Sequence, residues 1–323
     1  MKEKILSLLN EKTYVSGEEI SQQLGVSRTA IWKQMKALVA EGYTFDAVTR
    51  KGYRIVSRPD TLKSYDIWPY LTTSFLGRHI HDYEVVSSTQ FVAHEYANKE
   101  APEGTLIVAD AQQQGRGRLA RPWQSKQGVG ISMSLLLRPQ IEPQRAPQLT
   151  LLAAVAVVRA IEQVSGLSCD IKWPNDILYK GKKLVGILTE MAADPDWVKY
   201  VIVGMGVNCH HEREDFADGL ADVATSIQLE TGKRISRANL VAATINEFEW
   251  LYEAYVEEGF MAIKPLWEAR AISLHTYVHV RTSRETLHGY ALGITDDGRL
   301  RVRDEGGDIH LVYSADIELD TTR

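Results

Sequence analysis

The chain has 323 residues, a formal net charge of −5 and a hydrophobic share of 44%. These values are typical of a globular protein of two or three domains with an apolar core. Two cysteines, Cys169 and Cys209, exclude a disulfide-rich scaffold, and no signal-peptide core or long membrane-spanning run of apolar residues is recognisable. We therefore expect a cytoplasmic protein with no membrane partner.

Residues 1–60 are predicted to form a winged helix-turn-helix DNA-binding domain. Apolar residues at 5–9 predict a first short helix. A second helix is predicted to begin after Ser16, which forms a capping-box pattern with Glu19, and to end at Gly25. A third helix follows after a short turn, which is the helix-turn-helix pattern.

The third helix, capped by Ser27, completes a helix-turn-helix at about 17–36. Its predicted apolar stripe consists of Ile31, Met35, Leu38 and Val39. A hairpin at 43–56 with a basic tip is expected to be the wing. The candidate DNA contacts are Ser27, Arg28, Thr29, Trp32, Lys33, Lys36, Arg50 and Lys51.

Local charge favours DNA as the partner of this domain. Residues 28–58 hold seven Lys or Arg against two acidic residues, a net charge of +5 in a chain that is acidic overall. Basic side chains neutralise phosphates and release counterions, while a recognition helix reads the major groove. A winged helix that makes only protein contacts is the alternative, and the charge argues against it.

Arg58-Pro59-Asp60 is predicted to be a linker to a central domain over 66–268. Alternating and continuous apolar segments predict an α+β fold whose central α/β part has a mixed sheet. The predicted strands cover 105–109, 130–137, 169–172, 177–179, 184–188 and 200–207. Long helices are predicted at 149–164 and from Ser236 to about Val256.

Residues 270–323 change character again and are predicted to form a small SH3-like β-barrel domain. Short apolar stretches separated by Asp-Gly and Gly-Gly turn signals predict antiparallel strands there. The predicted strands cover 276–281, 286–294, 300–304 and 309–311.

A basic, glycine-rich loop is the most informative local feature. Residues 111–141 hold five basic residues and no acidic one, centred on Gly115-Arg116-Gly117-Arg118 and followed by Arg121 and Trp123. Glycine lets backbone approach a ligand closely, and the arginine fork suits phosphate and carboxylate oxygens. The segment predicts a polyanion site beside an aromatic face, against the alternative of an exposed solvated loop.

Two familiar nucleotide motifs do not account for this loop. Gly115, Gly117 and Ala120 formally fit the G-x-G-x-x-G/A fingerprint, but the preceding strand and following apolar helix that it requires are missing. A G-x-x-x-x-G-K-[ST] phosphate loop does not occur in the chain.

Four further segments carry groups that suit a small polar or anionic ligand. Each also has a plain structural interpretation: a helix cap for 87–90, a proline turn for 172–176, solubilising lysines at 182–183 and a strand-end bulge for 204–208. A fifth, Cys209-His210-His211-Glu212, has metal-ligand residue types, but consecutive residues rarely converge on one ion, so we expect no metal held by a protein cage there.

The order of these segments resembles the biotin protein ligases. Ser-Thr is followed by Gly-Arg-Gly-Arg with a later Trp, then Lys-Trp-Pro-Asn-Asp, then Lys-Lys-Leu-x-Gly-Ile-Leu, then Gly-x-Gly-x-Asn. With the N-terminal winged helix, the chain resembles a bifunctional biotin ligase that is also the repressor of a biotin operon. One departure is Ala120, where members of the family often carry glycine.

The resemblance implies a two-step reaction. Biotin and ATP give biotinyl-5′-AMP and pyrophosphate, and biotin is then transferred to a lysine of the biotin carboxyl carrier protein. The implied catalytic residues are Arg116, Arg118 and Lys183. The implied biotin-binding residues are Ser88, Thr89, Gln90, Gln112, Gly115, Arg116, Gly117, Arg118 and Lys183. The implied nucleotide-binding residues are Arg121, Trp123, Lys172, Asn175, Asp176 and Asn208.

Further expectations concern ions, partners and rivals. Asp176 is a candidate carboxylate on the Mg²⁺ side of the nucleotide. Implied partners are the carrier protein of biotin-dependent carboxylases, operator DNA, and a second copy of the chain when biotinyl-5′-AMP is bound. The rivals are a lipoate protein ligase and a transcription factor that only senses a small anion. The glycine-rich loop is expected to close on its ligand.

Overall fold

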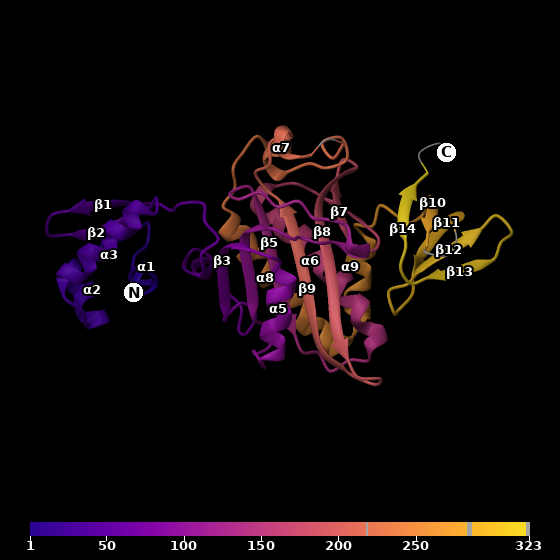
Figure 1. The fold of residues 1–323 in the computed structure, drawn as a ribbon, viewed down its shortest axis with the longest axis horizontal. Coiled ribbons are helices and arrows are strands. Elements are labelled where there is room, and N and C mark those ends of the chain that lie inside the picture. Colours follow the sequence, from indigo (N-terminus) through magenta and orange to yellow (C-terminus); the bar gives the residue numbers. More distant parts are fainter. Residues whose placement is uncertain (218, 283–285, 321–323) are drawn as a thin grey trace.

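The computed structural model describes residues 1–323 with the exception of 218, 283–285 and 321–323. A small N-terminal module and a C-terminal β module lie at opposite ends of a larger central body (Figure 1). The three parts follow one another in chain order, so only short connections run between them.

The N-terminal module is a winged helix-turn-helix, as predicted. Its elements are α1 (Lys2–Leu8), α2 (Gly17–Leu24), α3 (Arg28–Ala40), β1 (Thr44–Val48) and β2 (Gly52–Ser57). The side chains of Ser16 and Ser27 accept hydrogen bonds from the backbone N–H of Glu19 and Ala30, and Gly25 ends α2 in the left-handed region. The expected caps therefore define this turn.

The apolar stripe of α3 is correct except at its last position. Ile31, Met35 and Leu38 are buried against α1 and the wing, whereas Val39 is 56% exposed. Val39 follows Leu38 directly, and on a helix neighbouring residues point about 100° apart, so the two cannot share one narrow buried face.

A short linker with its own contacts joins this module to the central body. The hydroxyl groups of Tyr43, in the N-terminal module, and Thr61 both donate hydrogen bonds to the buried carboxylate of Asp66. Asp66 lies in the short helix α4 (Ser64–Ile67). The N-terminal module is thus hydrogen-bonded to the start of the central body.

A seven-stranded mixed sheet forms the central body, in the order β3-β4-β5-β9-β8-β7-β6. Only β3 and β4 run parallel, and the other neighbours are antiparallel. The strands are β3 (Ile80–Val86), β4 (Leu106–Gln112), β5 (Gly130–Leu137), β6 (Asp170–Lys172), β7 (Asp176–Tyr179), β8 (Lys182–Ala193) and β9 (Val198–Asn208).

Helices cover the two faces of this sheet unequally. The long helices α6 (Ala146–Ser165) and α8 (Arg237–Glu258) pack on one face and on each other. On the other face, α5 (Thr89–Asn98) packs on alternate residues of the central strands, including Ile107, Leu136 and Ile202. The short helices α7 (Ile227–Thr231) and α9 (Lys264–Glu268) complete the body.

Helix α6 is the core helix of the protein. By length and composition alone, the stretch Pro143–Ser165 could cross a membrane, but 67% of its most apolar window is buried inside the protein. Its apolar side chains are therefore accounted for by packing between the sheet and α8.

The C-terminal module is a five-stranded antiparallel sheet in the order β13-β12-β11-β10-β14. Its strands are β10 (Tyr277–Arg281), β11 (Thr286–Ile294), β12 (Leu300–Asp304), β13 (Ile309–Val312) and β14 (Asp316–Leu319). Four of them match predicted strands. The last, β14, lies in a segment with no clear apolar run and was not predicted. It pairs with β10 and forms one edge of the sheet.

Candidate functional site

A cleft with a volume of about 240 Å³ lies between the basic loop and one end of the central sheet. It brings together most residues that the sequence had singled out. Those lining it are Ser88, Thr89, Gln90, Gln112, Arg116, Gly117, Arg118, Arg121, Trp123, Asn175, Asp176, Lys183 and Asn208. Lys172 and Gly115 are not among the lining residues.

The inner end of the cleft is a buried polar network. Thr89 donates from its backbone N–H (2.8 Å) and hydroxyl (3.1 Å) to the Gln112 side-chain carbonyl. The Ser134 hydroxyl lies 2.8 Å from the Thr89 hydroxyl and 2.9 Å from the Gln90 carbonyl oxygen. Although Ser88 precedes α5, its side chain makes no capping hydrogen bond. The helix-cap interpretation of this segment is therefore wrong for Ser88, whose hydroxyl belongs to the cleft.

Three sheet glycines form the floor of the cleft because side chains pass directly over them. A Cβ on Gly206 would lie 2.5 Å from the Trp123 ring, and one on Gly186, its cross-strand partner, 3.0 Å. A Cβ on Gly204 would lie 2.8 Å from the Gln90 amide oxygen. Strand pairing is regular at all three positions, so close packing of side chains, rather than a bulge, explains these glycines.

The basic loop is a narrow hairpin. The Trp123 N–H donates to the Gly115 carbonyl (2.8 Å), and the Gly117 N–H donates to the Arg121 carbonyl (2.7 Å). At the tip, Leu119 and Ala120 both have positive φ, 55° and 57°. Residues other than glycine rarely adopt this conformation, so alanine at position 120 carries a cost in backbone conformational energy that glycine would avoid.

The arginines of this hairpin reach the C-terminal module. Arg118 donates to the Ala315 carbonyl (3.2 Å) and to the Ser314 hydroxyl (2.5 Å), while Arg121 forms an ion pair with Asp316. Burial lowers the pKa of Arg118 from its ordinary value, although the guanidinium remains charged. Asp316, the first residue of β14, lines the cleft, so the C-terminal module contributes to its wall.

Lys183, on β8, lines the cleft. Its Nζ lies 2.6 Å from a carboxylate oxygen of Asp176 and 5.8 Å from the centre of the Trp123 ring. Asn175 accepts a hydrogen bond from Arg118 (3.3 Å) and donates one to the Ile187 carbonyl (2.6 Å). A lysine, an arginine, an amide and a carboxylate thus surround one small volume.

Sequence reasoning missed Glu190, which organises the opposite wall. Both its carboxylate oxygens lie 3.0 Å from Nη2 of Arg116, whose guanidinium stacks over the Phe91 ring at 4.2 Å. Hydrogen bonding from His94 and the charge of Arg116 keep the pKa of Glu190 below its ordinary value despite partial burial. Glu190 also accepts from the Gln90 amide at 3.0 Å.

The outer lip of the cleft was also missed. It is apolar and consists of Phe216, Leu220, Val223 and Ala224. Backbone hydrogen bonds from Lys183 to the Val223 carbonyl (2.8 Å) and from Thr225 to the Lys183 carbonyl (2.9 Å) attach this lip to β8. No motif marks the segment, because its position depends on pairing between residues 40 positions apart.

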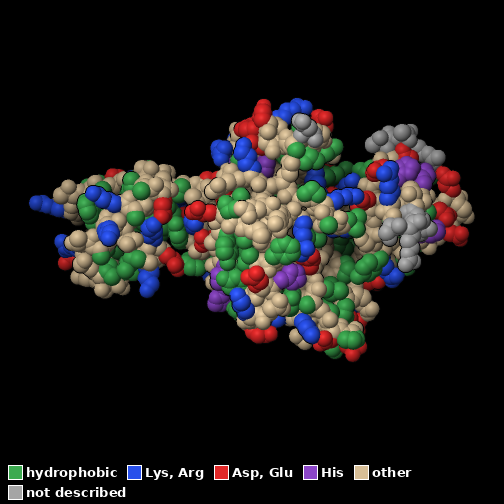
Figure 2. Space-filling view, viewed as in Figure 1, with side chains coloured by type: hydrophobic (Ala, Val, Ile, Leu, Met, Phe, Trp, Pro, Cys, Tyr) green, Lys and Arg blue, Asp and Glu red, His purple; other side chains and the backbone are tan. Residues whose placement is uncertain are grey.

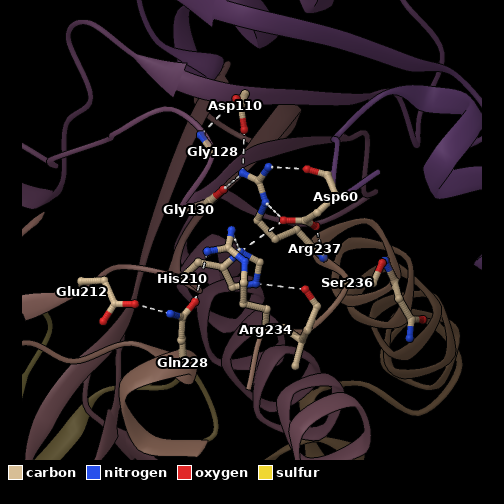
Figure 3. A network of polar contacts seen from close by, with 12 residues as sticks. Asp60, Asp110, Gly128, Gly130, His210, Glu212, Gln228, Arg234, Ser236 and Arg237 are labelled. Carbon is tan, nitrogen blue, oxygen red and sulfur yellow. Dashed lines mark hydrogen bonds and ion pairs between the residues drawn. The ribbon is translucent and has the colours of Figure 1, made fainter. Parts of the chain in front are cut away.

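Beside the cleft, a buried guanidinium connects several segments (Figure 3). Arg237, at the start of α8, donates to Asp60 in the linker (2.9 Å), to Asp110 on β4 (2.6 Å) and to the Gly130 carbonyl (2.8 Å). Asp110 in turn accepts from the Gly128 N–H at 3.1 Å. The linker and both strands that flank the basic loop therefore share one buried cation.

Histidines 210 and 211 lie in this region. The His210 Nε2 lies 3.0 Å from the Ile235 carbonyl, so Nε2 carries a proton and donates it. Its Nδ1 lies 3.0 Å from the Arg234 guanidinium and 3.2 Å from Oδ2 of Asp60. His211 lines the cleft and stacks on Phe216 at 5.2 Å, and burial lowers its pKa to about 4, so it is neutral at pH 7.

The predicted DNA-binding residues lie on the exposed face of the N-terminal module, where Figure 2 shows basic side chains. Trp32 is 53% exposed, and the Lys36 ammonium lies over its ring at 3.8 Å. Arg28 forms an exposed ion pair with Glu18 at 2.5 Å. The Ser27 hydroxyl caps α3. The surface offers cations and an aromatic face to a duplex.

Matches to known family models cover all three parts of the chain. Residues 2–54 match an HTH domain, residues 83–208 match the Biotin/lipoate A/B protein ligase family, and residues 277–320 match the Biotin protein ligase C terminal domain. The order of these matches is the order of the three parts in the structure.

Whole-chain relatives agree with these matches. The chain is 50% identical to "Bifunctional ligase/repressor BirA" of Bacillus subtilis, over 95% of this chain and 94% of that one, and 26% identical to the protein of the same name in Escherichia coli, over 94% and 92%. Among solved structures, the biotin protein ligase of Aquifex aeolicus in complex with biotin and ATP aligns with a TM-score of 0.64 and 27% identity, over 75% of this chain and 98% of that one.

Proposed function

The chain belongs to the family of bifunctional ligase/repressor proteins, is a biotin protein ligase with a repressor's DNA-binding domain, and we propose that it forms biotinyl-5′-AMP in the cleft beneath the basic loop. Transfer of biotin to a lysine of a carrier protein follows. The observation that carries the proposal is the convergence of Arg118, Lys183 and Asn175 on one small volume, with a buried polar network at its inner end.

Biotin offers a polar ureido head and an anionic carboxylate, and the cleft has a place for each. The hydroxyl groups of Ser88 and Thr89, which are buried, suit the head, and so does the half-buried amide of Gln112, which is hydrogen-bonded to Thr89. The carboxylate would then point toward Lys183 and the basic loop, where the positive charge is concentrated.

Adenylation requires no nucleophile from the protein. The biotin carboxylate attacks the α-phosphate of ATP, pyrophosphate leaves, and a mixed anhydride remains. The protein has to hold two anions together and stabilise the charge that grows at the α-phosphate. Arg118 and Lys183 would fill that role; both line the cleft, and the Lys183 Nζ lies 2.6 Å from a carboxylate oxygen of Asp176.

The residues present fit a magnesium ion that arrives with the nucleotide. Mg²⁺ is usually bound through one or two carboxylates together with substrate phosphates, rather than by a protein cage. Asp176 lines the cleft and supplies one such carboxylate. The ion would neutralise phosphate charge; Asp176 would hold it, exchanging its present pairing with Lys183 for one with the ion.

In the second step, a lysine of the carrier protein attacks the acyl carbon, forms an amide and releases AMP. The basic loop must retain the anhydride until then. The apolar lip formed by Phe216, Leu220, Val223 and Ala224 helps to exclude water from it. We infer a cytoplasmic protein that acts on carboxylase carrier proteins.

Ligand-dependent release of pyrophosphate tests the enzymatic proposal. Protein and ATP are mixed with biotin or with lipoate, and turnover is expected with biotin alone. Turnover with lipoate, or with neither acid, would refute the assignment. Arg118→Ala is expected to release biotinyl-5′-AMP at least tenfold faster, whereas Arg301→Ala, on the exposed face of β12, leaves release unchanged.

For the repressor, we propose that bound biotinyl-5′-AMP favours a homodimer that spans two operator half-sites. The support is structural continuity: the linker residue Asp60 and the strands beside the basic loop share Arg237. Operator binding is measured by fluorescence anisotropy with and without biotinyl-5′-AMP, and equal affinity in the two conditions contradicts the proposal.

A further inference from the structure

Two histidines and an aspartate lie together on the outer face of the C-terminal sheet, away from the cleft. His279 on β10 and His288 on β11 are direct cross-strand partners. Asp320 directly follows β14, and its backbone N–H donates to the Tyr277 carbonyl at 3.0 Å. One ligand atom from each of these three residues lies within 4.8 Å of the other two. Histidine side chains are visible on this module in Figure 2.

The arrangement is held by the strand pairing rather than by flexible loops. The two chain neighbours of His279, Val278 and Val280, are buried in the core on the opposite face of the sheet. Since side chains alternate along a strand, burial of these valines directs His279 outward. The imidazoles of His279 and His288 stack with centroids 4.5 Å apart and planes at 25°.

The two nitrogens of His288 face different carboxylates. Its Nε2 lies 3.3 Å from Oδ2 of Asp320, and its Nδ1 lies 3.4 Å from Oε1 of Glu305. Metal-bound histidines commonly donate their second ring N–H to a carboxylate, which fixes the tautomer and raises the basicity of the ligating nitrogen. Glu305 is placed to play that part, which leaves Nε2 for the ion.

We propose that His279, His288 and Asp320 form a binding site for one divalent transition metal ion of the zinc class. Two imidazole nitrogens and one carboxylate oxygen are a ligand set that suits Zn²⁺, with water as the fourth ligand. Magnesium and calcium prefer all-oxygen sites, which separates this site from the carboxylate in the cleft.

An ion here would connect three strands of the module at one point. β14 begins at Asp316, which pairs with Arg121 of the basic loop, and ends next to Asp320. The proposed ion therefore has a structural role and takes no part in the ligase reaction. It stabilises the strand whose first residue contacts the loop over the cleft.

The same sheet contains a matched control. His310 on β13 lies 2.7 Å from Asp304 on β12, so this pair has the same residue types and a shorter contact. Among the described residues, it is not part of a group of three candidate ligands. Binding that depends on histidine alone would involve both places, whereas a three-ligand site involves only the first.

Calorimetric titration of the metal-stripped full-length protein with Zn²⁺ tests the proposal. We expect one ion per chain, and at least tenfold weaker binding in His279→Ala and in His288→Ala. Glu305→Gln is expected to weaken binding by about tenfold, the lower end of what such supporting carboxylates contribute. His310→Ala is expected to bind as the wild type does. Co²⁺ in place of Zn²⁺ should give the visible absorption of a nitrogen- and oxygen-ligated ion.

A second measurement uses only wild-type protein, so that it does not depend on how the variants fold. Zn²⁺ should protect His279 and His288 from acylation by diethyl pyrocarbonate, as read by mass spectrometry, while His310 remains reactive. Absence of stoichiometric binding, undiminished binding in His279→Ala and His288→Ala, or equal protection of all three histidines would overturn the proposal. Because the cleft residues are untouched, biotin-dependent pyrophosphate release is expected to be normal in every variant.

Discussion

Replacing Arg237 by leucine should destabilise the central body more than any exposed ion pair can. The side chain of Arg237 is 2% exposed, and it is the shared donor to Asp60, Asp110 and the Gly130 carbonyl. Leucine fills part of the volume but leaves two partly buried carboxylates without their cation and a buried carbonyl without its donor.

The magnitude follows from that environment. Removing one partner of a buried ion pair costs about 3–5 kcal/mol, because the remaining charge stays buried without compensation. Burial alone would raise the pKa of Asp60, but the hydrogen bonding of His210 and the charge of Arg237 hold that pKa below its ordinary value. Asp60 therefore contributes stability that is present above about pH 4 and lost as the pH falls through the lowered pKa.

Urea unfolding at pH 7, followed by intrinsic tryptophan fluorescence, measures this effect as the shift in the midpoint of the transition in which the central body unfolds. The control is Arg159→Leu, which removes a half-exposed ion pair to Glu247 (3.3 Å) and should cost about 1 kcal/mol or less. Arg237→Lys keeps the charge without the planar fork and should fall in between. The reasoning fails if Arg237→Leu and Arg159→Leu shift the midpoint equally, or if the loss in Arg237→Leu is the same at pH 4 and pH 7.

Three other outcomes are expected. Gly206→Ala places a Cβ 2.5 Å from the Trp123 ring, so the indole must move. Biotin-dependent pyrophosphate release should therefore fall at least tenfold, and the tryptophan emission should shift. An unchanged rate would show that the reaction does not need the indole in this position. The carboxylate of Glu249 accepts hydrogen bonds from three backbone N–H groups, which lower its pKa although burial would raise it. The stability lost in Glu249→Gln should therefore be largest above about pH 5 and shrink below about pH 4. Urea unfolding at each pH measures this loss. Burial raises the pKa of Cys209, so a thiol reagent should label it only after unfolding, and labelling of the native protein would contradict that burial.

Features that depend on neighbouring residues could be predicted from the sequence. The caps at Ser16, Ser27 and Ser236 each accept the hydrogen bond that their residue type implies. The strand at Gly130–Leu137 has the predicted bounds, because a mostly apolar run of residues ends at Arg138. The helix-turn-helix followed from such local signals alone.

The cleft could be predicted only as a set of segments, because their order along the chain resembles a known family. What assembles them is long-range. Ser134 and Glu190 lie in strands that read as core, and their polar groups become functional because α5 brings Gln90 over both. Lys172 lies in the expected motif but does not line the cleft, whereas Asn175 and Asp176 of the same motif do.

The hydrogen bond between Tyr43 and Asp66 has a practical meaning for dividing the protein. Asp66, at the start of the central body, supplies an acceptor to the N-terminal module, and Asp60, in the predicted linker, supplies a counter-ion to Arg237 of the central body. A cut after residue 60 would separate Tyr43 in the first fragment from its buried acceptor Asp66. It would also separate Arg237 in the second fragment from its counter-ion Asp60. The two fragments are therefore not independent building blocks, and an exchange of DNA-binding domains between relatives should carry the whole segment from Tyr43 to Asp66.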